Sequence, residues 1–276
     1  MGGGQVIILK FFKRLFRLCI DRHYKRHAVI RHSYRVQSLL GVGSYGTTYL
    51  CKDLTTNRIC VVKQMTKSKR KKVIQEQFKQ ETTLLAQLNE TNIPTLYDSF
   101  IFENTLFIAM EYMEGINLED VLFLKKQRFS EKESLLLIHE LMQILASIHS
   151  SGIVHGDIRI PNVILQDASK PAIIDFGLAK QWKSASDQSD PKANETKLAL
   201  LREDFYDLGD LLLFLLYSNY DSGIKKGRPW TEELTLHPKT SHLLKRLLRM
   251  EKPYWNITEI MEDVTQAIAQ LHSNKH

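Results

Sequence analysis

The stretch that decides the fold is His155-Gly-Asp157-Ile-Arg159-Ile-Pro-Asn162, which is followed after an apolar run by Asp175-Phe-Gly177. Two acids and an amide thus stand on short turns between apolar strands, where polar side chains are usually just solvated. Asp157 and Asn162 are five residues apart, with a proline between them that stiffens the loop. Asn162 and Asp175 offer hard oxygen ligands that suit Mg²⁺ held together with phosphates, and Asp157 is left to accept a hydroxyl proton.

The segment before this loop predicts a buried helix. Ser130-Glu-Lys-Glu133 has the pattern of a capping box, in which the serine and the glutamate each satisfy a backbone N–H of the first turn. The following residues are strongly apolar up to Ile148, and Gly152 is expected to end the helix. This helix is most simply part of a core.

A glycine-rich turn lies far upstream, at Gly41-Val-Gly43-Ser-Tyr-Gly46. Glycines allow a tight turn and a close approach of the backbone to a phosphate. A dinucleotide-binding turn would open a helix at Gly46, but residues 47–51 are β-branched and aromatic and favour a strand. Because residues 34–40 also read as a strand, we predict a hairpin with a glycine-rich tip.

Residues 58–63 read as a third strand that ends in Lys63. A lysine there can simply extend to solvent at the strand end. A helix is expected from about Val73 to Leu88, with Glu81 near its inward edge, where it could pair with Lys63 and aim the amine at a nucleotide. Residues 95–112 predict two strands joined by a turn at Glu103-Asn104. The first third of the chain is therefore expected to be a twisted antiparallel sheet with one helix.

Taken in order, these features resemble the protein kinase family over about Tyr34 to Leu271. The five-part signature is the glycine loop, the strand lysine, the helix glutamate, H-x-D-x-x-x-x-N and D-F-G. The resemblance is strongest to the small bacterial eukaryotic-like (Hanks-type) Ser/Thr protein kinases. It implies an α+β bilobal fold at 33–272, with an antiparallel-sheet lobe at 33–112 and a shortened, mostly helical lobe at 113–272. It also implies transfer of the γ-phosphoryl group of ATP, with Mg²⁺, to Ser/Thr hydroxyls of proteins, the chain itself included.

The resemblance gives each site residue an expected role. Asp157 would orient the acceptor hydroxyl and take its proton, with Lys63, Glu81 and Arg159 as the other catalytic residues. Asn162 and Asp175 would bind Mg²⁺. His155, Phe176, Gly177 and Asp207 would support the site, Asp207 by bracing the catalytic loop from a central helix. The expected ATP-binding residues, with a hinge at 110–113 that meets adenine, are Leu40, Gly41, Val42, Gly43, Ser44, Tyr45, Gly46, Thr48, Val61, Lys63, Met110, Glu111, Met113 and Ile164.

The chain also departs from the family pattern. Gly156 replaces the arginine of H-R-D, which commonly pairs with a phosphorylated activation loop, so we expect a kinase that is not switched on in that way. Arg159 replaces the usual lysine and keeps the positive charge. No A-P-E and no obvious peptide-docking segment follow Asp175-Phe-Gly177, so this departure concerns peptide recognition and not phosphoryl transfer. The polar stretch 183–196 looks like a linker and holds the candidate self-phosphorylation sites Ser184, Ser186, Ser189 and Thr196.

Two other functions remain open. Aminoglycoside and choline kinases also carry an H-G-D loop, so a small-molecule kinase is one alternative. A pseudokinase scaffold is the other, although the residues such proteins usually lose are all present here. A nucleic-acid-binding function is not expected, because the excess positive charge is confined to residues 1–32, with a second basic run at Lys67 to Lys72, and neither run carries the base-stacking aromatic platform of the usual nucleic-acid-binding modules.

The charge of the chain is concentrated at one end. Residues 1–32 hold eight basic residues and one acidic residue, which accounts for the whole net charge of +7, and the remaining residues hold 30 of each sign. Apolar residues recur at helical spacing among these cations, so we expect a basic amphipathic helix. Its apolar face could pack on a protein surface, or residues 7–26 could contact an anionic membrane. The three cysteines are odd in number, lack C-x-x-C spacing and indicate a reducing, cytoplasmic compartment, with a peripheral position at the inner face of the membrane left open.

Overall fold

The computed structural model describes residues 23–166, 170–182, 191–220 and 228–273. The chain divides into two compact units. Unit 1 comprises residues 1–86 and 94–112, and unit 2 comprises residues 87–93 and 113–276. The amphipathic segment predicted near the N-terminus lies outside the described residues up to position 22.

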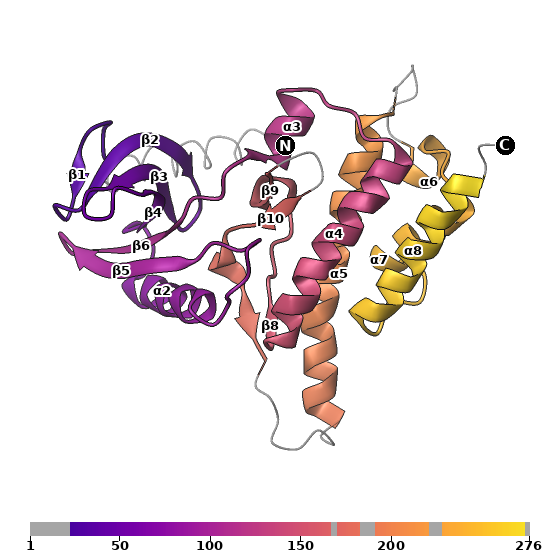
Figure 1. Ribbon diagram of the computed structural model, residues 1–276. Coiled ribbons are helices and arrows are strands. Elements are labelled where there is room, and N and C mark those ends of the chain that lie inside the picture. Colours follow the sequence, from indigo (N-terminus) through magenta and orange to yellow (C-terminus); the bar gives the residue numbers. More distant parts are fainter. Residues whose placement is uncertain (1–22, 167–169, 183–190, 221–227, 274–276) are drawn as a thin grey trace, which may run out of the picture. The chain divides into compact units, whose positions relative to one another are not determined.

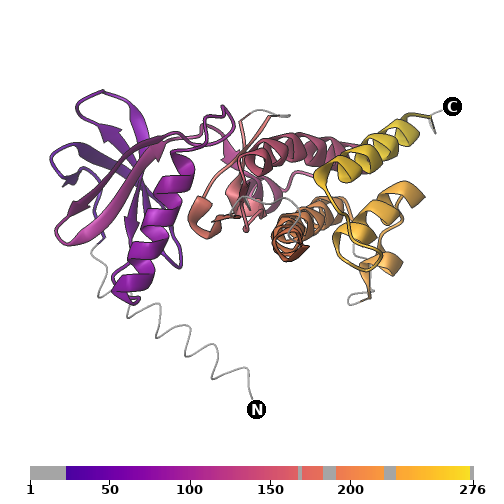
Figure 2. The same ribbon diagram turned by 90° about the horizontal axis from the view of Figure 1, so that it is seen from below.

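Unit 1 is built on a six-stranded antiparallel sheet in the order β1-β2-β3-β4-β6-β5, with one helix, α2, packed against β5 and β6 (Figures 1 and 2). The elements are β1 (Val29–Ile30), β2 (Tyr34–Val42), β3 (Gly46–Asp53), β4 (Ile59–Met65), α2 (Lys71–Leu85), β5 (Leu96–Phe102) and β6 (Thr105–Glu111). The expected hairpins and helix are present. Glu103 and Asn104 form the β5–β6 turn, both with positive φ, and the helix begins two residues earlier and ends three residues earlier than predicted.

Alternation along the strands gives this sheet two different faces. Tyr49 lies opposite Val62, and Cys51 lies opposite Cys60, in neighbouring strands. These four side chains are fully buried in a core that also contains Val36, Phe100, Phe107 and Ala109. Because successive residues point to opposite faces, Thr48 and its cross-strand partner Lys63 lie on the other face of the sheet.

The sheet of unit 1 begins before the expected domain boundary at residue 33. Strand β1 pairs with β2, and Ile30 is completely buried. The Tyr24 backbone N–H donates to the Tyr49 hydroxyl at 3.2 Å, and the Tyr24 ring lies edge-on to the rings of Tyr49 and Phe107. Residues 24–30 therefore contribute to this core, although the sequence placed them in the N-terminal basic segment.

Unit 2 is mainly helical. Its longest helices are α4 (Glu131–Ser150) and α5 (Pro191–Ser218), and α4 packs against both α5 and α8 (Figure 1). The other elements are β7 (Ile116–Asn117), α3 (Leu118–Phe123), β8 (Ile153–Val154), η1 (Ile160–Asn162), β9 (Val163–Leu165), β10 (Pro171–Ile173), η2 (Phe176–Leu178), β11 (Lys180–Gln181), α6 (Trp230–Glu233), α7 (Pro238–Leu247) and α8 (Ile257–Ser273). The predicted capping box is present at the start of α4. The expected linker at 183–196 is corrected by the structure, because residues from Pro191 onward belong to α5.

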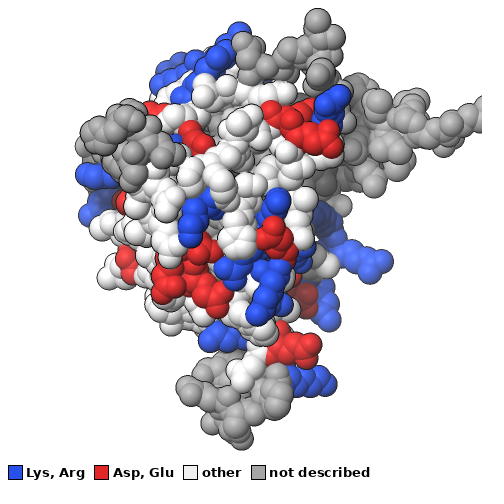
Figure 3. Space-filling view, turned by 90° about the vertical axis from the view of Figure 1, so that its right-hand side faces the viewer, with Lys and Arg blue, Asp and Glu red and all other residues white. Residues whose placement is uncertain are grey.

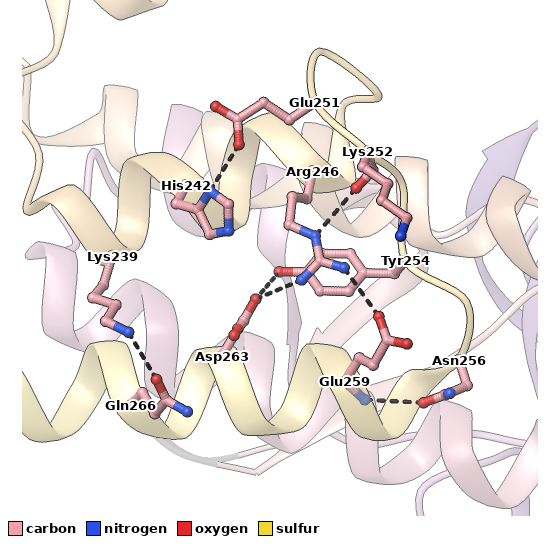
Figure 4. Close-up of polar contacts among 10 residues, drawn as sticks. All are labelled: Lys239, His242, Arg246, Glu251, Lys252, Tyr254, Asn256, Glu259, Asp263 and Gln266. Atoms are coloured by element: carbon pink, nitrogen blue, oxygen red, sulfur yellow. Dashed lines mark hydrogen bonds and ion pairs between the residues drawn. The ribbon is translucent and has the colours of Figure 1, made fainter.

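One arginine joins α7 to α8 (Figure 4). The Arg246 guanidinium forms ion pairs with Glu259 and Asp263, each at 3.0 Å, and its Nε donates to the Lys252 carbonyl at 3.1 Å. The same group lies 3.7 Å from the centre of the Tyr254 ring, whose hydroxyl donates to Asp263. Each of the three nitrogens of this planar group thus has a partner on α8 or in the loop before it, so Arg246 fixes α7, α8 and the loop between them.

The surface in Figure 3 shows acidic and basic side chains side by side, in keeping with the charge balance of residues beyond 32. None of the helices in the described part of the chain is both long and apolar enough to cross a bilayer.

Candidate active site

The glycine-rich turn forms the tip of the β2–β3 hairpin, as predicted. The Gly43 N–H donates to the Gly46 carbonyl at 2.8 Å and closes the turn. A Cβ atom at Gly46 would lie 2.3 Å from the Gln64 carbonyl oxygen, whereas one at Gly41 would have open space around it. Close approach of β3 to β4 therefore requires glycine at position 46. The flanking Leu40 and Val42 are about half exposed.

The strand lysine and the helix glutamate form the ion pair that the sequence predicted. Lys63 Nζ lies 2.7 Å from Glu81 Oε1, and both side chains are almost completely buried. The buried ammonium and carboxylate are tolerated because they neutralise each other in an ion pair. Lys63 is on β4 and Glu81 is on α2, so the pair also fixes the helix against the sheet.

The expected adenine-contacting residues of unit 1 lie on the lysine face of the sheet. Thr48 pairs with Lys63 across β3 and β4, and Val61 pairs with Met110 across β4 and β6. The chain passes from unit 1 to unit 2 between Tyr112 and Met113, within the expected hinge. The carboxylate of Glu111, also in this hinge, accepts hydrogen bonds from the backbone N–H and hydroxyl of Thr95.

Asp157 and its partners Arg159 and Asn162 lie between β8 and β9. Asn162 Nδ2 donates to the Asp157 carboxylate at 2.8 Å and to its backbone carbonyl at 2.9 Å. Arg159 donates from Nη2 to the same carboxylate at 2.9 Å and forms a second contact through Nε. This hydrogen bond raises the pKa of the Arg159 guanidinium further. The arginine thus keeps its charge beside the carboxylate that the sequence predicted to be catalytic.

Two carboxylates from α5 hold the backbone on both sides of Asp157. Asp204 accepts from the N–H groups of His155 at 3.0 Å and Gly156 at 2.6 Å. Asp207 accepts from the Ile158 N–H at 3.0 Å. The predicted contact from Asp207 to this loop is therefore present, but Asp204, which the sequence analysis missed, makes more contacts. The sequence could have indicated Asp204, because it lies three residues before Asp207 on the same helix and the two acids therefore share one face.

Asp204 also accepts a hydrogen bond from a third donor. His149, at the end of α4, has its Nε2 at 2.8 Å from Asp204 Oδ2, and Asp204 is completely buried. The pKa of Asp207 is raised to about 6 by burial, with Asp204 and Asp157 adding to the effect. A group of three carboxylates is thus concentrated around one loop, where backbone N–H groups and Arg159 balance part of the charge.

Gly156 occupies a backbone conformation that explains the missing arginine locally. Its φ is +72°, in the left-handed region that glycine adopts without strain. A Cβ atom at this position would lie 3.0 Å from the Leu178 carbonyl oxygen. Glycine at position 156 therefore adopts this turn without backbone strain, and its N–H donates to the Asp204 carboxylate.

His155, which the sequence predicted to support the site, lies between the Asp157 loop and the segment around Asp175. It is completely buried, its Nε2 lies 3.2 Å from the Ile174 carbonyl, and its ring lies edge-on to Phe176. Burial lowers the pKa of its imidazole, so the neutral ring donates from Nε2 to that carbonyl. His155 thereby links the Asp157 loop to the Asp175 turn.

Asp175 lies on an exposed turn directly after the buried strand β10. Its φ is +65°, and its carboxylate accepts from the Gly177 N–H at 3.3 Å. Asn162 uses its Nδ2 for Asp157, so its side-chain oxygen remains as a ligand, and the Ile174 N–H donates to its backbone carbonyl. One carboxylate and one amide oxygen fit a Mg²⁺ ion that takes its other ligands from phosphates and water. Ile164, the remaining adenine candidate, lies on β9 between β7 and β10.

A glycine hairpin and a buried lysine–glutamate pair in one unit, and an aspartate–asparagine loop with a D-F-G turn in the other, define a phosphotransferase of the kinase type. A family model for the protein kinase domain matches residues 34–197. The chain therefore belongs to the protein kinase family, which confirms the family and the fold class inferred from the sequence.

Similar curated proteins are kinases as well. The chain is 40% identical over 93% of its length to the probable serine/threonine-protein kinase YbdM of Bacillus subtilis, and it covers 97% of that protein. It is 32% identical to serine/threonine-protein kinase D of Synechocystis sp. and 34% identical to PknA of Nostoc sp., in both cases over 55% of its own length. It spans only 31% and 28% of those two proteins.

Proposed function

We propose that the chain transfers the γ-phosphoryl group of ATP, with Mg²⁺, to serine or threonine hydroxyls of proteins, including its own. The observation that carries this proposal is the fixed position of the Asp157 carboxylate. Asn162 and Arg159 hold the side chain, while Asp204 and Asp207 hold the peptide groups on either side. The family and the names of its relatives support a protein hydroxyl as the acceptor.

Each residue contributes positioning and charge. When bound, Mg²⁺·ATP supplies the phosphoryl group and part of the charge neutralisation. Lys63, held by Glu81, would bind the α- and β-phosphates, and the backbone of the glycine hairpin would cover them. Asn162 and Asp175 would hold the metal. The Asp157 carboxylate would orient the acceptor hydroxyl and take its proton, and Arg159 beside it would face the γ-phosphate.

The test compares the full chain with Asp157→Ala and with the control Asp210→Ala, a partly exposed acid on α5 outside the site. Transfer of labelled γ-phosphate would be measured on the protein itself, on a generic basic protein and on a panel of small alcohols. We expect Asp157→Ala to lower turnover by about 10²–10⁴-fold, with nucleotide affinity within about threefold. Asp210→Ala should stay near the wild-type rate.

The outcomes separate the possible functions. Label on protein serine or threonine that is lost in Asp157→Ala supports the proposal. Label only on a small alcohol would replace it with a small-molecule kinase. ATP binding without transfer to any acceptor would replace it with a pseudokinase scaffold.

We also propose that the basic segment at residues 7–26 contacts the anionic inner face of the membrane, in an otherwise cytoplasmic protein. The uneven distribution of charge supports this idea. Replacement of Lys10, Lys13, Arg14 and Arg17 by serine should abolish co-sedimentation with vesicles rich in phosphatidylserine. Equal sedimentation of the two proteins would contradict the proposal.

A further inference from the structure

The tip of the β2–β3 hairpin projects most of its residues into solvent. Residues 41–44 are exposed, whereas Tyr45, the last residue of the turn, is half-buried. Strand β2, which leads into the tip, is irregular, because its register with β3 shifts twice along its length. Such irregularities leave residues unpaired and bend the strand, so the ladder alone holds the tip less firmly than a regular hairpin would. The position of the tip therefore depends also on contacts from outside the hairpin.

The segment that follows β4 provides two such contacts. The Thr66 backbone N–H donates to the Tyr45 carbonyl at 2.9 Å. Lys69 places its Nζ over the Tyr45 ring, 3.3 Å from the ring centre. A cation in this position is attracted by the negative face of the aromatic ring. One residue of the hairpin tip is thus bound through its backbone and through its side chain by residues 66–69.

The 66–69 segment is itself held in place. The Ser68 N–H donates to the Thr66 hydroxyl at 3.2 Å, and the hydroxyl groups of these two residues lie 2.8 Å apart. Lys67 Nζ donates to the Glu103 backbone carbonyl in the β5–β6 turn at 3.0 Å. Lys69 is half-buried, which restricts its side chain. The segment is therefore a fixed support from which Lys69 reaches the hairpin, and every residue of this arrangement belongs to unit 1.

We propose that Lys69 is a positioning residue for the nucleotide. It holds the Tyr45 ring and so keeps the backbone N–H groups of the glycine hairpin in the place where they meet the phosphates of ATP. This role rests on the proposed function, in which the hairpin covers those phosphates. Lys69 acts through the ring of Tyr45, and it is not itself a phosphate ligand.

The contact should affect nucleotide binding and not the chemical step. A hairpin tip that is already held in position loses less conformational freedom when ATP binds, so the complex is tighter. The hairpin would hold ATP equally in the ground state and in the transition state, and the loss of such uniform binding raises KM and leaves kcat unchanged. Loss of the Lys69 contact should therefore appear in KM for ATP.

The experiment uses the full chain with Lys69→Met, which removes the charge and keeps an unbranched side chain, and Lys69→Arg, which keeps a cation. Lys72→Met is the matched control, because this nearby lysine is 87% exposed and pairs with Glu76. Tyr45→Leu and the double variant Tyr45→Leu/Lys69→Met complete a double-mutant cycle. Kinetic constants for ATP and equilibrium binding of labelled ATP with Mg²⁺ are measured for each protein. Amide hydrogen exchange at Gly43 and Thr66 is followed by NMR without nucleotide.

We expect Lys69→Met to raise KM for ATP and the dissociation constant by about threefold to tenfold, the range that one cation–aromatic contact supplies, with kcat within about twofold. Exchange at Gly43 and Thr66 should accelerate by a similar factor. Lys69→Arg and Lys72→Met should stay near the wild type. In the Tyr45→Leu background, Lys69→Met should add less than about twofold, because the ring is already absent.

The other outcomes would overturn the proposal at defined points. Full additivity of Lys69→Met and Tyr45→Leu would show that the charge of Lys69 attracts the phosphates directly. Unchanged hydrogen exchange in Lys69→Met would show that the contact does not hold the hairpin. Faster exchange with unchanged ATP affinity would overturn the role in nucleotide binding. A chain whose hydrogen exchange and ATP affinity depend on Lys69, but which transfers no phosphate to any acceptor, would contradict only the proposed function.

Discussion

Asp204 accepts hydrogen bonds from two backbone N–H groups and one imidazole while completely buried. Asp204→Ala would leave these donors without an acceptor. We expect the free energy of unfolding to fall by about 3–5 kcal/mol and phosphoryl transfer per folded molecule to fall at least tenfold, because the Asp157 loop loses its clamp. Urea denaturation and a transfer assay would measure both, with Asp210→Ala as control. Normal activity in Asp204→Ala would contradict the role of this clamp.

Asp207 should give unfolding a specific pH dependence. Its pKa is about 6 in the folded chain, against 3.8 for an ordinary aspartate. Between these values the native state holds the proton more tightly, so this residue makes stability fall as pH rises from about 4 to about 6. Asp207→Asn should remove that slope and raise stability at pH 8 by about 1–2 kcal/mol. Unchanged denaturation midpoints across this pH range would contradict the prediction.

The thiols of Cys51 and Cys60 should be unreactive in the folded chain. They face each other across β3 and β4 as free, buried cysteines, and burial raises their pKa values to about 12 and about 11. The thiolate is the reactive form and is nearly absent at pH 8. In a Cys19→Ser background, a thiol reagent should titrate no cysteine before denaturant is added and two afterwards. Rapid labelling under native conditions would show that the β3–β4 pair opens.

Among the elements, the β2–β3 hairpin depends on one glycine more than on the others. A methyl group at Gly46 would collide with the Gln64 carbonyl, whereas the space around Gly41 is open. Gly46→Ala should therefore destabilise unit 1 by about 2–4 kcal/mol and raise KM for ATP. Gly41→Ala should leave stability within about 0.5 kcal/mol. Equal effects of the two substitutions on thermal unfolding would contradict the steric argument.

The elements also show what the sequence could predict. Period-two alternation and turn residues were sufficient to predict the hairpins of unit 1. The Ser130–Glu133 pattern was sufficient to predict where α4 begins. The start of α5 was missed because Lys192, Asn194, Glu195 and Thr196 are polar and exposed, so the segment has no apolar repeat. Two of the three partners of Asp204 are backbone N–H groups, which leave no trace in side-chain patterns, so only its spacing from Asp207 on the same helix could have indicated this residue. Strand β1 is only two residues long and gave no periodic signal.

At the scale of the whole molecule, the two units can be followed by different probes. The chain has three tryptophans, Trp182, Trp230 and Trp255, and all belong to unit 2. Tryptophan fluorescence should therefore report the unfolding of unit 2 alone, while far-ultraviolet circular dichroism reports both units. Arg246→Ala removes the ion pairs between α7 and α8. It should lower the free energy of unfolding of unit 2 by about 2–3 kcal/mol and move the fluorescence transition to lower denaturant concentration.

The control for this measurement is Gly46→Ala, which alters unit 1. It should move the circular dichroism transition and leave the tryptophan transition in place if the units unfold independently. Coincident transitions in every variant would instead show one cooperative unfolding step for the whole chain.

The hydrogen bonds from Asp204 and Asp207 to the Asp157 loop also have a consequence for the order of folding. The bonds from α5 to this loop join residues 48 and 49 positions apart in the chain. During synthesis, the loop therefore leaves the ribosome well before the carboxylates that shape it. The local sequence of the loop does not determine its conformation, so the loop becomes ordered only when α5 packs against it and forms these long-range hydrogen bonds. During refolding, activity should consequently return later than the far-ultraviolet circular dichroism of the helices. Each newly made chain would therefore acquire its helices before its activity.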